Sequence, residues 1–265
     1  MSRFRIAILL CALTGFLLLN TGCSTVPVTG RSQLNLISAQ EETQLGLASF
    51  NQIKKEVPIS RDASANAMLR RVGRRVANAA SPDLPGANWE FVLFDSSEAN
   101  AFALPGGKVG IYEGILPITQ DDAGLATVMA HEIAHVTAHH GGERVSQQMM
   151  LQYGGQMINA TTLALSPQTQ QLVSLAYGIG SSVGVQLPHS RGQESEADHI
   201  GLIYMARAGY DPREAVDFWK RFADYNRRSG SSGTPSFLRT HPLDEDRIRQ
   251  IESWLDEAEQ QYQQP

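Results

Sequence analysis

The stretch "HEIAHVTAHH", residues 131–140, places four histidines and one glutamate within ten positions of a 265-residue chain. It follows the apolar run "LATVMA", so a largely buried helix is predicted from about residue 122 to residue 140. Residues four apart on a helix lie about 40° apart around its axis and about 6 Å apart along it, so His131 and His135 can direct two imidazoles at one metal ion. Glu132 projects beside them, where a carboxylate can take a proton from water. We predict His131 and His135 as metal ligands and Glu132 as the general base.

The other two histidines of the stretch are assigned no metal role. A pair of His135 and His139 would have valine at the position of the base, and His139 lies about 12 Å along the helix from His131. We therefore expect His139 and His140 to be surface or capping residues at a helix C-terminus, where positive charge is favourable. The two glycines that follow, at positions 141 and 142, are predicted to end this helix.

A catalytic metal site uses three protein ligands and keeps one position open for water. The extended motif with a third histidine requires glycine at position 138 and histidine at position 141, where this chain has alanine and glycine. A predicted helix at about 191–208 offers "RGQESEADHIG" instead, in which Glu194 and Asp198 share one face. We predict Glu194 as the third ligand and Asp198 as the acceptor that orients a histidine ligand through a hydrogen bond. Glu196 points about 160° away from Asp198 and is assigned no role. The alternative for this helix is a solvated acidic face.

The N-terminus has the pattern of an export signal. Arg3 and Arg5 precede an uncharged run over residues 6–19, "IAILLCALTGFLLL", and "NTGC" follows it. A helix of this length would span about 21 Å, short of the roughly 30 Å of a bilayer core. A signal peptide over residues 1–22 is therefore favoured over a short anchor helix.

Cys11 falls within that apolar run, so cleavage before Cys23 leaves one thiol, at the first residue of the mature chain. "NTGC" resembles the lipobox of bacterial lipoproteins, with Asn20 where that pattern prefers leucine, and lipidation is predicted at Cys23. Residues 23–38 would then form a lead-in or tether. The formal charge of −5 is a poor match to nucleic acid, and no nucleic-acid partner is expected.

The rest of the chain predicts an α+β fold that is mostly α-helical, with a single domain over residues 39–265. The β region is confined to "WEFVLF", residues 89–94, and to two short strands joined around residues 105–107. Further helices are predicted at about 39–55, 65–80, 143–158, 167–180, 212–227 and 243–261, with a flexible loop at 227–236. We expect the small β-sheet to pack beside the metal-binding helix.

The second of the two short strands is a candidate for binding substrate. Lys108, Val109, Gly110 and Ile111 are predicted to form an exposed edge strand that can hydrogen-bond an extended peptide across the metal. Gly110 would permit the close approach of a second backbone. The alternative is a structural hairpin that packs beneath the metal-binding helix.

Several segments together resemble one family of enzymes. "HEIAH", followed about sixty residues later by "ESEAD", is similar to the gluzincin metallopeptidases related to HtpX, the CAAX-processing proteases, BepA and LoiP. "VPVTGR", "NAFALPGGKVGIYEGIL" and "RTHPLDEDRI" extend the similarity over most of residues 25–255. The chain is not similar to the multi-span membrane domains of HtpX or to the C-terminal helical repeats of BepA, so we expect a LoiP-like periplasmic lipoprotein.

The resemblance implies a zincin-type fold, one Zn²⁺ ion per chain and endopeptidase activity. It further implies unfolded or misassembled envelope proteins as substrates, and attachment by the lipid anchor to the periplasmic side of a bacterial membrane, with the outer membrane expected. For His241, it implies a switch that can occupy the fourth zinc position and hold the enzyme inactive. The alternative function is a latent or catalytically silent zinc-containing lipoprotein that acts as a chaperone for envelope proteins, although the intact Glu132 argues against a silent site.

Overall fold

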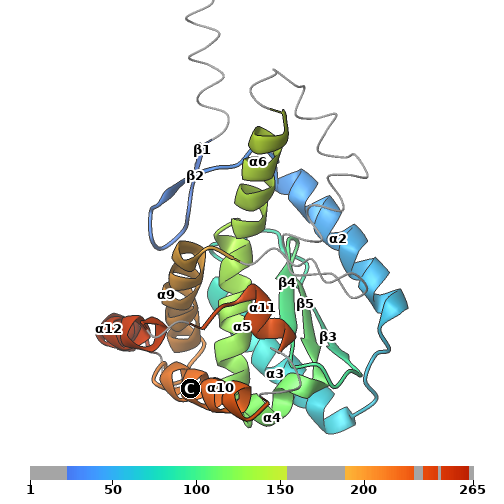
Figure 1. The fold of residues 1–265 in the computed structure, drawn as a ribbon, viewed down its shortest axis with the longest axis vertical. Helices are drawn as coiled ribbons and strands as arrows, with labels where there is room; N and C mark the ends of the chain where they lie inside the picture. Colours follow the sequence, from blue (N-terminus) through green and yellow to red (C-terminus); the bar gives the residue numbers. More distant parts are fainter. Residues whose placement is uncertain (1–22, 154–188, 230–234, 244–245, 263–265) are drawn as a thin grey trace, which may run out of the picture.

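The computed structural model describes residues 23–153, 189–229, 235–243 and 246–262 (Figure 1), so the expected signal peptide and the helix expected at 167–180 lie outside the described residues. The strands are β1 (Cys23–Thr25), β2 (Ser32–Leu34), β3 (Glu90–Phe94), β4 (Ala101–Leu104) and β5 (Lys108–Tyr112). The helices are α2 (Ala39–Glu56), α3 (Ala63–Ala80), η1 (Glu113–Ile115), α4 (Leu116–Thr119), α5 (Asp122–Thr137), α6 (His140–Tyr153), α9 (Arg191–Arg207), α10 (Glu214–Ser229), α11 (Ser236–Thr240) and α12 (Arg247–Glu259). The fold is α+β and mostly helical, as predicted.

Helix α5 lies at the centre of the molecule, between the three-stranded sheet and α9 (Figure 1). Asp121 begins it by accepting hydrogen bonds from the backbone N–H groups of Ala123 and Gly124, as an N-cap does. Every residue from Gly124 to Thr137 is buried. A helix that is buried on all sides requires apolar or small residues around its whole circumference, and the run "LATVMA" provides them.

Helix α9 packs directly on α5. Ser190 and Gln193 form a capping box at its N-terminus. Further along, a Cβ atom at Gly201 would stand 3.2 Å from the backbone nitrogen of His131 and 3.3 Å from its Cα atom. The absence of a side chain at Gly201 therefore sets how closely the two helices approach each other.

The sheet has the strand order β3-β5-β4, with β3 parallel and β4 antiparallel to β5. The prediction that Lys108, Val109, Gly110 and Ile111 form an exposed edge strand is wrong, because β5 is paired on both sides and all of its residues are buried. The hairpin of β4 and β5 was predicted, but β3 pairs with β5, the second strand of the hairpin, and this leaves β4 at an edge of the sheet. The close approach at Gly110 is to the ring of Phe102, which a Cβ atom at that position would overlap.

The chain turns sooner after α5 than predicted. The helix ends at Thr137, His139 has a left-handed φ of 51°, and α6 begins at His140. The two glycines at 141 and 142 therefore lie inside α6 and do not end α5. The turn is held from another part of the chain, because Glu42 of α2 contacts His139 Nδ1 at 2.5 Å.

The expected lead-in folds into a hairpin in which β1 and β2 pair antiparallel, Cys23 opposite Leu34. It lies near the ends of α6 and α9 (Figure 1). Among the described helices, none is both long enough and apolar enough to cross a membrane. Of the loop expected at 227–236, residues 230–234 lie outside the description, while α10 extends to Ser229 and α11 starts at Ser236.

Candidate metal centre

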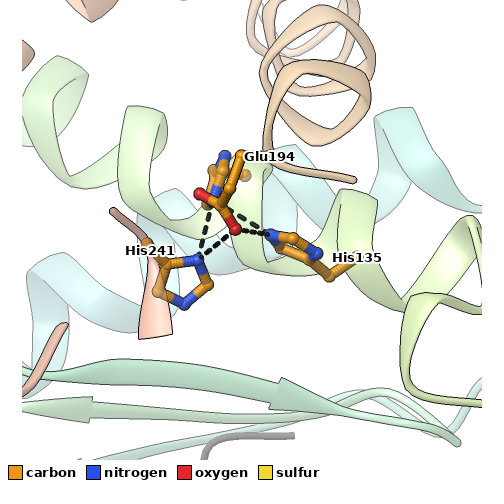
Figure 2. A group of neighbouring side chains, drawn as sticks. His135, Glu194 and His241 are labelled. Atoms are coloured by element: carbon orange, nitrogen blue, oxygen red, sulfur yellow. Dashed lines mark hydrogen bonds and ion pairs between the residues drawn. The ribbon is translucent and has the colours of Figure 1, made fainter. Parts of the chain in front are cut away.

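Four buried side chains from three parts of the fold converge on one point: His131 and His135 of α5, Glu194 of α9, and His241 after α11. Figure 2 shows Glu194 directed between His135 and His241. The Nε2 atoms of His131 and His135 are 3.1 Å apart, and they lie 3.4 and 3.3 Å from the two Glu194 carboxylate oxygens. His241 Nδ1 lies 3.2 Å from His131 Nε2 and 3.0 Å from Glu194 Oε1.

These distances fit a tetrahedral metal ion. Bonds of about 2.0–2.1 Å to zinc would place neighbouring donor atoms about 3.3–3.4 Å apart. The observed separations of 3.0–3.4 Å are close to that edge length, with Glu194 Oε1 beside His135 and His241 and Oε2 beside His131. Three imidazole nitrogens and one carboxylate are also donors that zinc accepts. The group could therefore hold a metal ion without a large rearrangement of its side chains.

Glu132 lies beside the donor group and does not belong to it. Its Oε1 atom is 3.2 Å from His241 Nε2, and its carboxylate also accepts a hydrogen bond from the backbone of Ala103 in β4. Burial raises the pKa of Glu132 above its usual value, while the nearby His241 and His131 oppose that shift. A carboxylate whose pKa is raised towards neutrality is better matched to taking up and returning a proton.

On the side of its ring away from the donor group, His131 contacts Asp198 of α9. Its Nδ1 atom lies 2.9 Å from Asp198 Oδ1. Arg247, which sequence analysis missed, holds Asp198 with a two-pronged contact of 2.7 and 2.9 Å and stacks 3.5 Å over the Trp219 ring. Arg247 Nη1 also lies 3.0 Å from Glu194 Oε2. Burial acts to raise the pKa of Glu194, but the charges of His241 and Arg247 hold it well below its usual value.

The prediction that His140 is a surface or capping residue is wrong. His140 is fully buried, with its Nδ1 atom 2.8 Å from His135 Nδ1 and its Nε2 atom 2.9 Å from Glu196 Oε2. The early turn after α5 brings its ring back against the metal-binding helix. His139 is the half-buried residue at the helix end, and it pairs with Glu42. Glu196 is likewise buried, and the solvated acidic face considered for α9 does not form.

His241 is held in place by two aromatic neighbours. Its ring stacks on Phe237, at 4.4 Å between centroids and 27° between planes, and on His189, at 5.0 Å and 22°. The backbone N–H of His189 donates to the carbonyl of Thr240, so the two segments are joined beside the site. His189 has no role predicted from the sequence, because a single histidine before "SRGQE" gives no local sign of its partner.

Comparison with known proteins gives a consistent result. A profile described as Peptidase family M48 matches residues 63–255, which include all four donors and Glu132. The mitochondrial metalloendopeptidase OMA1 of Saccharomyces cerevisiae is 31% identical over 258 residues, covering 92% of this chain and 72% of the relative. The OMA1 of Schizosaccharomyces pombe is 34% identical over 239 residues, covering 88% and 67%. The beta-barrel assembly-enhancing protease of Escherichia coli K12 is 31% identical over 228 residues, covering 84% of this chain and 46% of that protein. The chain therefore belongs to peptidase family M48 and is a metalloprotease.

Proposed function

We propose that this chain is a zinc endopeptidase of the cell envelope that cleaves unfolded or misassembled proteins, and that the described conformation is its closed form. The observation that carries the proposal is the near-tetrahedral group of His131, His135, Glu194 and His241 with Glu132 beside it. A site that only stabilises the fold has no use for a carboxylate placed next to its ligands.

The chain's own residues supply the parts of a hydrolytic reaction. A zinc ion held by His131, His135 and Glu194 would act as a Lewis acid toward a peptide carbonyl and lower the pKa of water. Glu132 takes the proton of the attacking water and returns it to the leaving amine. Asp198 keeps His131 oriented through its Nδ1 atom during both steps.

His241 occupies the position that a substrate and water require. It fills the fourth corner of the donor group with Nδ1 and faces Glu132 with Nε2. Glu132 and the four donors are each at most 4% exposed, so a peptide cannot reach them in this conformation. Activity therefore requires His241 to leave its place between Phe237 and His189. This arrangement favours a latent enzyme, the alternative that the sequence left open, over a silent one.

The edge strand that would receive a peptide once the site opens is β4, whose residues are all buried in this closed conformation. The Tyr112 N–H donates to the carbonyl of Asn100, so by the alternation of antiparallel pairs the backbone groups of Ala101 and Ala103 point away from β5. The Ala103 backbone already reaches Glu132 on that side. A peptide paired with β4 would lie across the catalytic carboxylate and be recognised through its backbone. Such recognition selects extended, unfolded segments more than a particular sequence.

The proposed location rests on the N-terminal pattern. An export signal that ends at Cys23 would leave a lipid-anchored chain on the periplasmic side of a bacterial membrane, with the outer membrane expected. The relatives are named for two settings, the mitochondrion and the assembly of β-barrels. Labelling of bacterial cells with a radioactive fatty acid should mark the wild-type protein and leave Cys23→Ala unlabelled. Equal labelling of both would exclude anchoring at this cysteine.

The enzymatic proposal is tested with purified protein and unfolded β-casein. We expect slow cleavage by the wild type, faster cleavage by His241→Ala and no cleavage by Glu132→Gln. We also expect about one zinc per chain, because the two possible donor groups among the described residues, the four donors above and the trio of His135, His140 and His189, share His135. That zinc should be lost in His131→Ala and Glu194→Ala. Cleavage by Glu132→Gln at the rate of the wild type would refute the mechanism. Absence of cleavage by all three proteins, with zinc bound, would favour a binding protein.

A further inference from the structure

The two candidate ligands of α5 are supported in different ways at their outer nitrogen. In a metal site, the ring nitrogen that does not bind the ion normally donates to a carboxylate or carbonyl, which fixes the orientation of the ring. His131 follows this rule directly, with Asp198 at 2.9 Å from its Nδ1. His135 has instead a second histidine there, since its Nδ1 lies 2.8 Å from His140 Nδ1.

The contact between His135 and His140 has one consistent assignment of protons. If His135 Nε2 offers its lone pair to a metal, a neutral ring carries its proton on Nδ1 and donates it to His140 Nδ1. His140 must then carry its own proton on Nε2, which lies 2.9 Å from Glu196 Oε2 and donates to it. The sequence His135, His140, Glu196 is therefore an unbroken line of hydrogen bonds directed away from the metal.

The outer end of this line is held by the N-terminal hairpin. Arg31 Nε lies 2.7 Å from Glu196 Oε2, and the Thr29 hydroxyl lies 2.5 Å from Glu196 Oε1. The same guanidinium holds Glu143 of α6 with contacts of 2.8 and 3.0 Å. Arg31 thus ties the start of the described chain to α9 and α6 at the carboxylate that supports His140.

Both histidines of α5 are supported by a carboxylate that an arginine holds in place. Asp198 supports His131 and is itself held by Arg247, at 2.7 and 2.9 Å. Glu196 supports His135 through His140 and is itself held by Arg31. In both cases an arginine fixes the carboxylate that fixes the ring.

We propose that His140, Glu196 and Arg31 are positioning residues that orient His135 for the metal, so that the N-terminal hairpin is part of the metal centre. This inference rests on the proposed metal site. It gives the segment next to the expected lipid attachment site a second role, because residues 29 and 31 complete the support of a ligand. Seven residues, at positions 24–30, separate the expected anchor at Cys23 from Arg31.

The test compares three variants with a matched control. Arg31→Gln removes the cation at the outer end, and His140→Leu removes the acceptor for His135. His140→Asn keeps an acceptor near the position of Nδ1 and is the conservative variant. The control is Arg71→Gln, because Arg71 holds Asp122 with a similar two-pronged contact of 2.7 and 2.6 Å, in an exposed position outside the donor group.

Three measurements distinguish positioning from general stability. The first is the zinc dissociation constant, by competition with a chromophoric chelator at fixed pH. The second is the visible spectrum of the cobalt-saturated protein, which reports the geometry of the ligands. The third is urea unfolding of the metal-free protein. Because Arg31 is partly exposed, Arg31→Gln is expected to remain folded even if His140→Leu does not.

We expect zinc binding to weaken about 10- to 100-fold in His140→Leu and about tenfold in Arg31→Gln. His140→Asn should lose less than His140→Leu, the cobalt spectrum should change in both weakened variants, and Arg71→Gln should match the wild type. Unchanged zinc affinity and cobalt spectrum in Arg31→Gln and in His140→Leu would overturn the inference and leave the metal site intact. A fall in urea stability with an unchanged cobalt spectrum would also overturn it, as a purely structural effect. Zinc retained by both His131→Ala and Glu194→Ala would instead refute the metal site itself.

Discussion

Gly201 controls the spacing between the two helices that carry the metal centre, and Gly201→Ala should weaken zinc binding without unfolding the protein. The new methyl group would stand 3.2, 3.3 and 3.4 Å from the backbone nitrogen and Cα of His131 and the carbonyl carbon of Ala130. Ordinary carbon contacts are about 3.5–4.0 Å, so α9 must move outward by about 0.3–0.5 Å. Metal–ligand distances tolerate deviations of only about 0.2 Å. Because α9 carries Glu194, this displacement would shift the Glu194 carboxylate by more than a metal–ligand distance tolerates.

The effect on the free energy of unfolding combines two opposing contributions. Alanine is favoured over glycine within a helix by up to about 1 kcal/mol, whereas inserting a methyl group into a packed interface typically costs about 1–3 kcal/mol. We therefore expect a net loss of at most about 2 kcal/mol in urea unfolding of the metal-free protein. Zinc affinity, measured by chelator competition, should fall about tenfold, which corresponds to about 1.4 kcal/mol.

Gly192→Ala is the matched control on the same helix. The nearest atom that a Cβ atom at Gly192 would meet is Ser190 Oγ, at 4.0 Å. This variant should gain up to about 1 kcal/mol of stability and bind zinc as tightly as the wild type. Zinc binding by Gly201→Ala with the affinity of the wild type would show that close contact between α5 and α9 does not govern the metal centre.

Three further predictions concern metal, packing and pH. Zinc at 100 times its dissociation constant should add about 2.7 kcal/mol to the free energy of unfolding, a difference that a chelator removes and that His131→Ala lacks. Gly110→Ala should lower the free energy of unfolding in urea by about 1–3 kcal/mol, because a methyl group at this position of the central strand would overlap the Phe102 ring of β4. An unchanged urea midpoint would contradict this packing. Burial raises the pKa of Tyr112 to about 12, whereas the phenol in the unfolded chain ionises near pH 10, so stability present below pH 10 should be lost as pH rises towards 12, by up to about 2.7 kcal/mol. Tyr112→Phe should flatten that part of the urea profile, and an alkaline loss equal to that of the wild type would assign it to other groups.

The sequence was most informative about side chains whose relative positions follow from the repeat of a single helix. The four-residue spacing of His131 and His135 places both rings on one side of α5, as the structure shows. The same four-residue spacing pairs Glu194 with Asp198 and leaves Glu196 on another face, and it is Glu194 that faces the two rings. These placements follow from helix geometry alone, since nothing outside α5 and α9 has to be known beyond their packing together.

The sequence was least informative about positions that depend on contacts between residues far apart in the chain. The turn after α5 occurs at a histidine in the left-handed region, a conformation that local propensity disfavours and that Glu42 supports from 97 positions away in the chain. Because that turn was not foreseen, His140 was placed on the surface. The exchange of edge and central strands has the same origin, since a hairpin pattern contains no information about which of its strands β3 will join. Arg31 and Arg247 were missed because their carboxylate partners lie 165 and 49 positions away.

The charges around the donor group themselves argue for a divalent cation. Glu194 and Asp198 are both buried, and the pKa of each is held below its usual value, so both are ionised at neutral pH. Arg247 contacts both and balances one of the two negative charges. Glu132 adds a further negative charge whenever it acts as a base. Without a bound ion, burial acts to lower the pKa of His131, but the contacts with Asp198 and Glu194 raise it to about 9, so a proton on this ring balances the second carboxylate. A divalent cation among His131, His135 and Glu194 would take the place of that proton and, together with Arg247, would balance Glu194, Asp198 and an ionised Glu132.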